Sequence, residues 1–204
     1  GDTRTLSFLF CDIVGFTPIS EHFKNNNDPQ GLVTLINRLL SALTDVVLSL
    51  DGTIDKYMGD CVMAFWGAPV DCDNHQERAV TCAAMMLVAL EKLNQEIEAE
   101  GLPRMGIGIG VNTGPCVIGN VGGDKRFDYS AIGDSVNVAA RLESSTRKYV
   151  QNVLIGEDTA KAVPDLVKPL DTIEVKGKSE KLAVFTLSGK AIHAAHLADH
   201  WAVK

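Results

Sequence analysis

Two long stretches of helical periodicity, each flanked by short apolar runs of strand length, limit the folds open to this chain. In the first stretch, apolar residues recur at helical spacing between Pro29 and Val47. Gly52 stands where the C-terminal glycine of such a helix is expected. The second predicted helix covers 74–100 and is stopped by Gly101. Amphipathic helices of this length must bury their apolar faces against a sheet or another helix.

Strand-length apolar runs stand before, between and after these helices. The first is nearly continuous, which is typical of a strand buried on both faces. The next two are joined at Gly59-Asp60 and predict a hairpin. The last two are expected to pair around a turn at 112–115. The expected strands are 6–13, 53–58, 61–66, 105–111 and 117–121.

The rest of the chain adds a helix from Asp134 to about Tyr149, capped by that aspartate, and a smaller strand-rich region. The order strand, helix, hairpin, helix, strand pair predicts an α+β sandwich, in which helices cover one face of a mostly antiparallel sheet. We expect one domain over 1–188, followed by a C-terminal tail over 189–204. Because the chain begins with Gly1 rather than Met, further sensor or membrane domains are expected outside it.

Composition narrows the class of protein. With 204 residues, of which 46% are hydrophobic and 22% charged, the chain can form a core and is not expected to be disordered. The net charge of −7 argues against nucleic acid as a partner, because phosphate backbones need clustered Lys and Arg. The five cysteines lack paired spacing, which favours reduced thiols and a cytoplasmic location. The longest apolar run, 79–90, is too short to span a bilayer, so no membrane contact by this segment is expected.

Two aspartates carry the first chemical hypothesis. Asp12 and Asp60 each end an apolar run near a glycine, where a strand meets a turn. A strand end holds a carboxylate rigidly, and the glycine lets a ligand approach the backbone. Either aspartate alone is more simply a turn residue. Together they could hold a pair of divalent cations against a polyphosphate, as in phosphoryl and nucleotidyl transfer.

A second set of residues suits a nucleotide. Asn137 and Arg141 share one face of the predicted helix, where an amide can orient a ribose and a guanidinium can stabilise phosphoryl charge. A solvated helical face explains these two residues equally well. Lys56 and Ser130 could read the adenine edge, the lysine donating to N1 and the hydroxyl accepting from the 6-amino group. A hydroxyl also donates, so this code is softer than that of a carboxylate, and an exposed strand lysine is the plainer explanation of Lys56.

Other patterns carry less weight. The loop 175–178, Val-Lys-Gly-Lys, is basic and flexible enough to hold terminal phosphates, although it is not a Walker loop. The glycines at 106, 108 and 110 lack the offset of a dinucleotide fingerprint and more simply allow close packing of a strand. Cys72 and His75 lack the second pair of ligands that a structural zinc site needs.

Four spaced motifs together resemble the catalytic domain of class III nucleotidyl cyclases, which make cyclic AMP or cyclic GMP. The resemblance covers roughly residues 5–188 and implies a ferredoxin-like core that works as a head-to-tail homodimer, with two equivalent sites at the interface. The motifs are Phe10-Cys-Asp-Ile-Val-Gly-Phe-Thr17, Lys56-Tyr-Met-Gly-Asp60, Tyr129-Ser-Ala-Ile-Gly-Asp-Ser-Val-Asn-Val-Ala-Ala-Arg141 and Val175-Lys-Gly-Lys178.

The resemblance implies a role for the metal and reaction residues. Asp12 and Asp60, with the carbonyl of Ile13, look like the holders of two divalent cations, Mg²⁺ or Mn²⁺. Asn137 and Arg141 look like the ribose and transition-state residues. The implied reaction converts ATP into 3′,5′-cyclic AMP and pyrophosphate: a cation lowers the pKa of the ribose 3′-hydroxyl, which attacks the α-phosphorus, and the guanidinium meets the developing charge. No side chain stands out as a general base.

The resemblance also implies a substrate site. Lys56 and Ser130 look like the purine-reading pair, Lys176 like a contact to the terminal phosphates, and Phe16 and Thr17 like further substrate contacts. Guanylyl cyclases of the family usually carry glutamate at the position of Lys56, so adenine is favoured. A serine at 130 resembles a bacterial and soluble-cyclase branch, some of whose members respond to bicarbonate, so bicarbonate regulation is an expectation to test.

Alternatives fit parts of the same pattern. A guanylyl cyclase would use the same motifs, and a catalytically silent cyclase-like domain would serve as a dimerisation or regulatory module. The segment 122–127 is similar to the signature of diguanylate cyclases, but that signature belongs in the central hairpin, which here holds Gly59-Asp60. Pro115 stands where some members of the family have a phosphate-binding arginine, a contact that Arg126 or Lys178 could supply.

Overall fold

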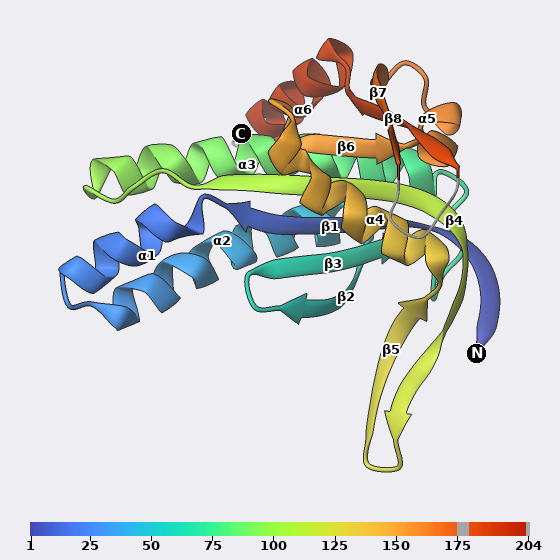
Figure 1. The fold of residues 1–204 in the computed structure, drawn as a ribbon, viewed down its shortest axis with the longest axis horizontal. Coiled ribbons are helices and arrows are strands. Elements are labelled where there is room, and N and C mark those ends of the chain that lie inside the picture. The colour runs from blue at the N-terminus through green and yellow to red at the C-terminus, as the bar shows by residue number, and fades with distance from the viewer. Residues whose placement is uncertain (175–179, 203–204) are drawn as a thin grey trace.

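The computed structural model describes residues 1–174 and 180–202, which alternate strands and helices around one sheet (Figure 1). The strands are β1 (Asp2–Val14), β2 (Thr53–Met58), β3 (Cys61–Trp66), β4 (Gly106–Gly123), β5 (Arg126–Ile132), β6 (Val153–Gly156), β7 (Val167–Glu174) and β8 (Lys181–Leu187). The helices are α1 (Phe16–Asn25), α2 (Pro29–Ser49), α3 (His75–Ala99), α4 (Asp134–Ser145), α5 (Glu157–Ala162) and α6 (Gly189–Ala202), with a short 3-10 helix, η1 (Thr146–Lys148), after α4. The β2–β3 hairpin and the two long helices lie where the sequence predicts them.

The sheet has a ferredoxin-like centre. Its strand order is β2-β3-β1-β4-β6-β8-β7, and β5 pairs with β4 outside this path. The first four strands are antiparallel neighbours, whereas β4 and β6 run parallel. The predicted α+β class with a mostly antiparallel sheet is therefore confirmed. Because β1 lies between β3 and β4, its C-terminal end, which carries Asp12, lies in the interior of the sheet.

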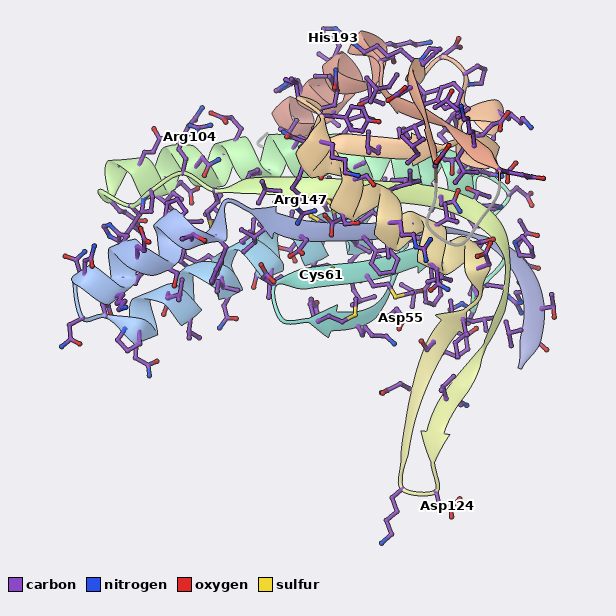
Figure 2. All side chains as sticks on the ribbon, viewed as in Figure 1. Asp55, Cys61, Arg104, Asp124, Arg147 and His193 are labelled. Carbon is purple, nitrogen blue, oxygen red and sulfur yellow. The ribbon has the colours of Figure 1, made fainter. Side chains whose placement is uncertain are left out.

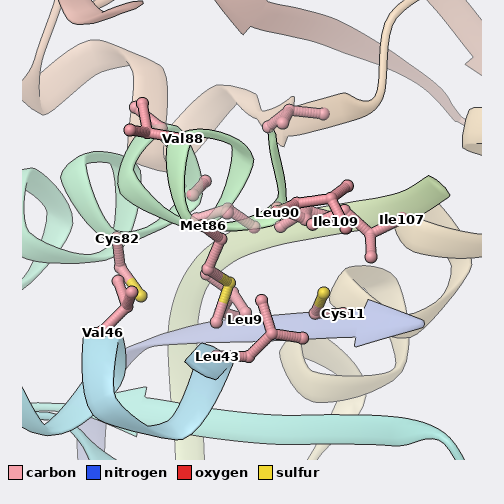
Figure 3. Packing of buried hydrophobic residues seen from close by; sticks show 14 of the residues in the cluster. Leu9, Cys11, Leu43, Val46, Cys82, Met86, Val88, Leu90, Ile107 and Ile109 are labelled. Atoms are coloured by element: carbon pink, nitrogen blue, oxygen red, sulfur yellow. The ribbon is translucent and has the colours of Figure 1, made fainter. Parts of the chain in front are cut away.

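The larger core lies between the sheet and the helices α2 and α3 (Figure 3). Alternate residues of β1 face opposite sides: Leu9 and Cys11 belong to this core, and Phe8 and Phe10 belong to a second cluster. β1 is thus buried on both faces, as its apolar run predicts. By length and composition alone α2 could cross a membrane, but its buried side, which includes Leu39, packs into this core.

Helix α4 covers the opposite face of the sheet, which corrects the expectation that the helices share one face. It crosses β4 at Gly108 and Gly110, two of the three glycines that the sequence pattern singled out. A Cβ on Gly110 would lie 2.3 Å from the backbone of Ala139 and of Glu143. No side chain fits at that separation, so glycine lets α4 and β4 pack backbone against backbone. Since α4 also contacts β1, this crossing determines where its side chains stand relative to the end of β1.

The turn expected at 112–115 does not form. Strand β4 runs unbroken over 106–123, and its hairpin partner is β5. β1 pairs along this stretch, with Thr5 opposite Pro115, and holds it extended. On the other side of β4, Pro115 falls between the pairing with β6 and the pairing with β5, so its missing N–H interrupts neither ladder there. Beyond this point the β4–β5 hairpin projects from the body as an arm (Figure 1).

The segment expected to be a tail forms α6, which packs on α3. Ala191 and Ala195 of this helix are buried in the larger core. A domain boundary at 188 therefore leaves out a helix that the core includes. The helix expected to reach Tyr149 ends earlier, because α4 tightens into η1 after Ser145.

Candidate active site

Asp12 and Asp60 meet at one end of the sheet. Asp12 stands near the end of β1, and Asp60 lies in the turn that enters β3, which pairs with β1 at Cys11 and Val62. The pKa of Asp12 is raised above its ordinary 3.8, first by burial and next by the negative charge of Asp60, whose carboxyl lies within hydrogen-bonding reach. The amide of Ile13 donates to Asp12 Oδ1 at 2.8 Å and acts in the opposite direction. The two carboxyl groups therefore form a site of unmet negative charge.

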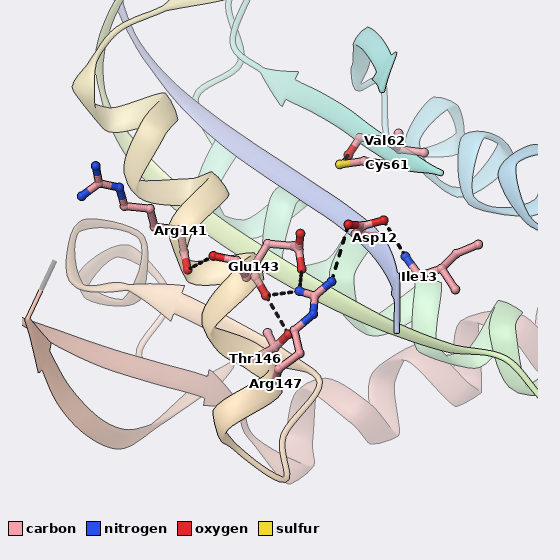
Figure 4. A network of polar contacts seen from close by, with 9 residues as sticks. Asp12, Ile13, Cys61, Val62, Arg141, Glu143, Thr146 and Arg147 are labelled. Atoms are coloured by element: carbon pink, nitrogen blue, oxygen red, sulfur yellow. Dashed lines mark hydrogen bonds and ion pairs between the residues drawn. The ribbon is translucent and has the colours of Figure 1, made fainter. Parts of the chain in front are cut away.

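An arginine that the sequence reasoning did not single out offsets part of this charge (Figure 4). Arg147 Nη2 lies 3.5 Å from Asp12 Oδ2, and Nη1 of the same guanidinium pairs with the carboxylate of Glu143. The pKa of Glu143 is raised above its ordinary value by burial, although pairing with Arg147 acts in the opposite direction. Glu143 and Arg147 are four residues apart, in α4 and in η1, so their spacing was the available signal.

The donor set fits a cation of the magnesium type. In the part of the chain that the structure describes, no group of three His, Cys, Asp or Glu side chains is placed to hold a metal. Mg²⁺ usually takes one or two carboxylates and completes its shell with water and substrate phosphates, so two aspartates suffice for that mode. A cation would also neutralise the repulsion that raises the pKa of Asp12. The assignment of Asp12, Asp60 and the Ile13 carbonyl as ligands stays a prediction.

Phe16 and Thr17 open helix α1 directly after this end of β1. Gly15 precedes them with φ 72°, a left-handed conformation that favours glycine, and turns the chain from strand into helix. No side chain caps this N-terminus, so its first N–H groups lack a side-chain acceptor, and such groups bind anions. Both residues are exposed, and their contact with substrate stays a prediction.

Lys56 and Ser130 come together at a second place, through a residue that the sequence reasoning did not single out. Ser130 Oγ donates to both carboxylate oxygens of Asp55, each at 3.0 Å, and Lys56 Nζ lies 3.5 Å from Asp55 Oδ1. The Asp55 side chain is completely buried, whereas that of Lys56 is about half exposed. Figure 2 places Asp55 near the base of the β4–β5 arm, away from Arg147.

Asn137 and Arg141 lie on α4 and are exposed. Figure 4 shows that the Arg141 side chain extends away from Asp12. A single chain thus brings the two carboxylates together but does not bring this guanidinium onto them. Lys176 and the rest of the loop 175–178 lie outside the described residues.

The cysteines beside the carboxylates are poor nucleophiles. Burial raises the pKa of Cys61 to about 12, with a further contribution from the charge of Asp12, and burial also raises the pKa of Cys11. A cysteine attacks as its thiolate, so both side chains stay inert near neutral pH. The geometry gives no support to covalent catalysis through either residue.

Comparison with known proteins points to one family. The family model for the adenylate and guanylate cyclase catalytic domain matches residues 2–189. Adenylate cyclase 1 of Rhizobium meliloti (strain 1021) is 38% identical over 188 residues, which cover 91% of this chain and 28% of that protein. The solved structure of the guanylyl cyclase Cya2 has a TM-score of 0.83 and 34% identity, covering 93% of this chain and 94% of that chain. The adenylyl cyclase CyaB from P. aeruginosa has a TM-score of 0.78 and 34% identity, covering 92% and 96%.

These similar proteins differ in the base for which they are named. The chain also spans only about a third of the length of the curated relatives it matches. Base preference therefore has to be argued from the residues of this chain.

Proposed function

This chain belongs to the adenylate and guanylate cyclase catalytic domain family, and we propose that it converts ATP into 3′,5′-cyclic AMP and pyrophosphate for intracellular signalling. The observation that carries the proposal is the convergence of Asp12 and Asp60 at one end of the sheet. Two adjacent carboxylates with unmet charge suit the cation-assisted attack of a ribose hydroxyl on phosphorus. The relatives named as adenylate cyclases, 38% and 35% identical, support ATP as the substrate.

The carboxylate pair supplies the cation site of this proposal. Asp12, Asp60 and the carbonyl of Ile13 would hold two divalent cations, Mg²⁺ or Mn²⁺. When bound, such cations lower the pKa of the ribose 3′-hydroxyl and neutralise phosphate charge. Arg147, 3.5 Å from Asp12, balances part of the carboxylate charge in the cation-free protein.

The remaining residues act on the nucleotide. Asn137 orients the ribose, and Arg141 donates hydrogen bonds to the α-phosphoryl oxygens, whose charge grows as the 3′-O–P bond forms and the bond to pyrophosphate breaks. Lys176 and the first amides of α1, at Phe16 and Thr17, hold the terminal phosphates. No side chain is assigned as general base, so the 3′-proton passes to water or to the substrate.

Two copies of the chain complete each site in this proposal. Because Arg141 extends away from Asp12 within one chain (Figure 4), the guanidinium of one protomer serves the carboxylates of its partner. A two-fold, head-to-tail homodimer then holds two equivalent sites. The projecting β4–β5 arm exposes Val117, Val121 and Ile132, which offer the partner an apolar surface.

Mixing two inactive variants tests the activity and the shared site together. Asp12→Asn removes a cation ligand, and Arg141→Ala removes the charge at the α-phosphate, so each homodimer should lose about 10²-fold or more in kcat. Arg141→Ala should leave ATP binding nearly unchanged, because its hydrogen bonds strengthen in the transition state. An equimolar mixture contains heterodimers with one intact site and should recover about a quarter of wild-type cyclic AMP production.

The controls separate the two parts of the proposal. Asp165→Asn, which changes an exposed aspartate paired with Lys190 far along the chain, should keep full activity. If verified wild-type dimer makes neither cyclic AMP from ATP nor cyclic GMP from GTP with Mg²⁺ or Mn²⁺, the domain is a silent regulatory module. If the wild type is active but verified mixing restores nothing, each site is built within one chain.

A guanylyl cyclase is the second candidate, because Cya2, with a TM-score of 0.83, carries that activity in its name. Parallel assays with ATP and GTP, with products separated by chromatography, distinguish the two and would also reveal a diguanylate product. We expect a cytoplasmic location for this domain. Bicarbonate stimulation is a further expectation, tested by titrating bicarbonate at constant pH.

A further inference from the structure

The Asp55 carboxylate is completely buried and is approached by donors from three residues. Its side chain is 0% exposed. Ser130 Oγ donates to both of its oxygens at 3.0 Å, and the amide of Ala131 donates to Oδ2 at 3.0 Å. The ammonium of Lys56 lies 3.5 Å from Oδ1. A carboxylate in this state is bound on several sides and has little freedom to move.

A strand irregularity explains why Asp55 faces this way. In the β2–β3 pair, Ile54 lies opposite Ala64 and Lys56 lies opposite Met63, so Asp55 is an extra residue with no partner in the ladder. Such a bulge re-aims a side chain that regular alternation would send elsewhere. Here it directs the carboxylate across to β5, where it meets Ser130.

The contact with Asp55 determines which way the Ser130 hydroxyl can hydrogen-bond. A hydroxyl has one proton and two lone pairs, whereas a carboxylate has no proton to give. The Ser130 proton is therefore committed to Asp55. Ser130 is 3% exposed, so little water competes for that proton. Toward any further partner the Ser130 oxygen is an acceptor alone.

We propose that Asp55 is a positioning residue that sets the purine preference of the site by making Ser130 an obligate acceptor. This inference rests on the proposed function, in which Lys56 and Ser130 read the base. Adenine carries a 6-amino donor beside the N1 acceptor, and guanine carries a 6-oxo acceptor beside an N1–H donor. An acceptor-only hydroxyl next to an ammonium donor matches adenine at both atoms and opposes guanine at both.

Asp55 also restrains Lys56, the second residue proposed to contact the base. Its charge lies 3.5 Å from Lys56 Nζ and limits the positions open to that long side chain. One buried carboxylate thus restrains both groups of the pair. A serine hydroxyl alone discriminates weakly between adenine and guanine, because it can donate or accept a hydrogen bond. Asp55 takes the proton of Ser130, so the hydroxyl can only accept and the discrimination becomes strong.

The first test is Asp55→Asn, measured as kcat/KM for ATP and for GTP in the same preparation. The amide keeps one acceptor for the Ala131 N–H and gives Ser130 a donor in place of the second oxygen. Ser130 can then turn its proton toward the base, so the ATP-to-GTP ratio should fall by about tenfold or more. Asp165→Asn is the matched control and should leave the ratio unchanged. A merely structural role would lower both activities together and keep the ratio.

A double-mutant cycle asks whether Asp55 acts through Ser130. In a Ser130→Ala background, Asp55→Asn should have little further effect on the ratio, because the hydroxyl that it orients is gone. Ser130→Thr retains a hydroxyl and should keep the adenine preference. A full additional effect of Asp55→Asn on Ser130→Ala would contradict the proposal.

A third measurement needs no variant and covers the case in which Asp55→Asn does not fold. Two ATP analogues of matched size, one with a 6-methylamino and one with a 6-methoxy group, both keep N1 as an acceptor and differ at position 6 as donor and acceptor. Competition by each for binding of a fluorescent ATP should favour the methylamino compound by about tenfold. Equal competition would overturn the inference.

The binding measurement also distinguishes a failure of the proposed cyclase activity from a failure of the proposed role of Asp55. If the wild type binds ATP with the expected preference but makes no cyclic nucleotide, the proposed activity fails and the role of Asp55 stands. If the wild type makes cyclic AMP but Asp55→Asn keeps its ratio, the role of Asp55 fails and the activity stands.

Discussion

The β2–β3 hairpin carries aspartates in opposite electrostatic conditions at two points along its length. The Asp55 side chain is completely buried, and it receives hydrogen bonds from Ser130 and from the amide of Ala131. Asp60, in the turn, adds its negative charge to Asp12, whose side chain is 26% exposed. The more buried carboxylate is the better satisfied one, and the more exposed pair has the unmet charge.

Burial by itself therefore does not identify the carboxylates that bind a ligand. What distinguishes them is the balance of donors against like charge. At Asp12, burial and the charge of Asp60 outweigh the Ile13 amide and Arg147, so the pKa is raised. Unfavourable electrostatics of this kind are retained at sites where a bound ligand relieves them. The carboxylate of Asp55, in contrast, already has hydrogen-bond donors from the protein, and its proposed role is to orient Ser130 and Lys56.

The largest expected difference between the two regions is in turnover. Asp60→Asn removes one of the two carboxylates proposed to hold the cations and should lower kcat/KM for ATP by about 10³-fold, equivalent to several kcal/mol of transition-state stabilisation. Asp55→Asn should lower ATP turnover much less, because its effect falls on base recognition. Initial rates of cyclic AMP formation at saturating Mn²⁺ compare them. Equal losses in the two variants would show that Asp55 and Asp60 do not differ in their contribution to catalysis.

Stability should respond in the opposite order. Asp55→Ala leaves the Ser130 hydroxyl and the Ala131 amide buried without their acceptor and should cost about 3 kcal/mol. For a chain of this size that corresponds to a fall in Tm of about 6–12 °C. Thermal unfolding followed by circular dichroism measures it, with Asp165→Asn as the exposed control. A fall in Tm below about 2 °C would mean that water replaces the carboxylate.

Divalent cations should stabilise the folded protein by binding at Asp12 and Asp60, and this stabilisation should not depend on Asp55. At a Mn²⁺ concentration 100 times the Kd, wild-type protein should gain about 2.7 kcal/mol of unfolding free energy by mass action. Asp55→Asn should gain as much, whereas Asp12→Asn should gain far less. Nucleotide-free protein is used, so the readout is independent of catalysis. A Mn²⁺ shift that survives Asp12→Asn would locate the cation elsewhere.

The smallest expected effect is a stabilisation by Asp12→Asn without metal. Because the folded-state pKa of Asp12 lies above 3.8, its ionised form costs stability at pH 7, and this cost disappears as the pH falls through the folded-state pKa toward 3.8. The uncharged variant avoids it and should unfold about 2–4 °C higher at pH 7. The difference in Tm should narrow steadily on acidification. A difference that is constant with pH would show that charge is not its cause.

Much of the fold could be read from local patterns. The hairpin 53–66 and the helices α2 and α3 follow from apolar spacing and from glycines at their ends. The turn at 112–115 was wrong, because Pro115 and its neighbours resemble a turn locally and are held extended by pairing with β1. The place of α4 on the second face was also missed, since its partner on β4 is a set of glycines whose meaning depends on what crosses them.

The candidate site divides in the same way. Asp12 and Asp60 were found because each one borders an apolar run near a glycine, a feature visible in a few neighbouring residues. Asp55 was missed although it directly precedes Lys56, because regular alternation gives no reason to aim it at Ser130. Arg147 lies within the helix expected to reach Tyr149 and was missed because its contact with Asp12 joins residues far apart in the sequence.

The amino-acid sequence by itself determined which residue types are available for chemistry and which elements carry them, because helix and strand periods are local properties of the chain. Tertiary structure decided how those residues act on one another. The bulge at Asp55 forms through pairing with β3, and the raised pKa of Asp12 arises from a carboxylate on another strand. Charge and hydrogen bonding operate through space, so their outcome depends on contacts between segments far apart in sequence.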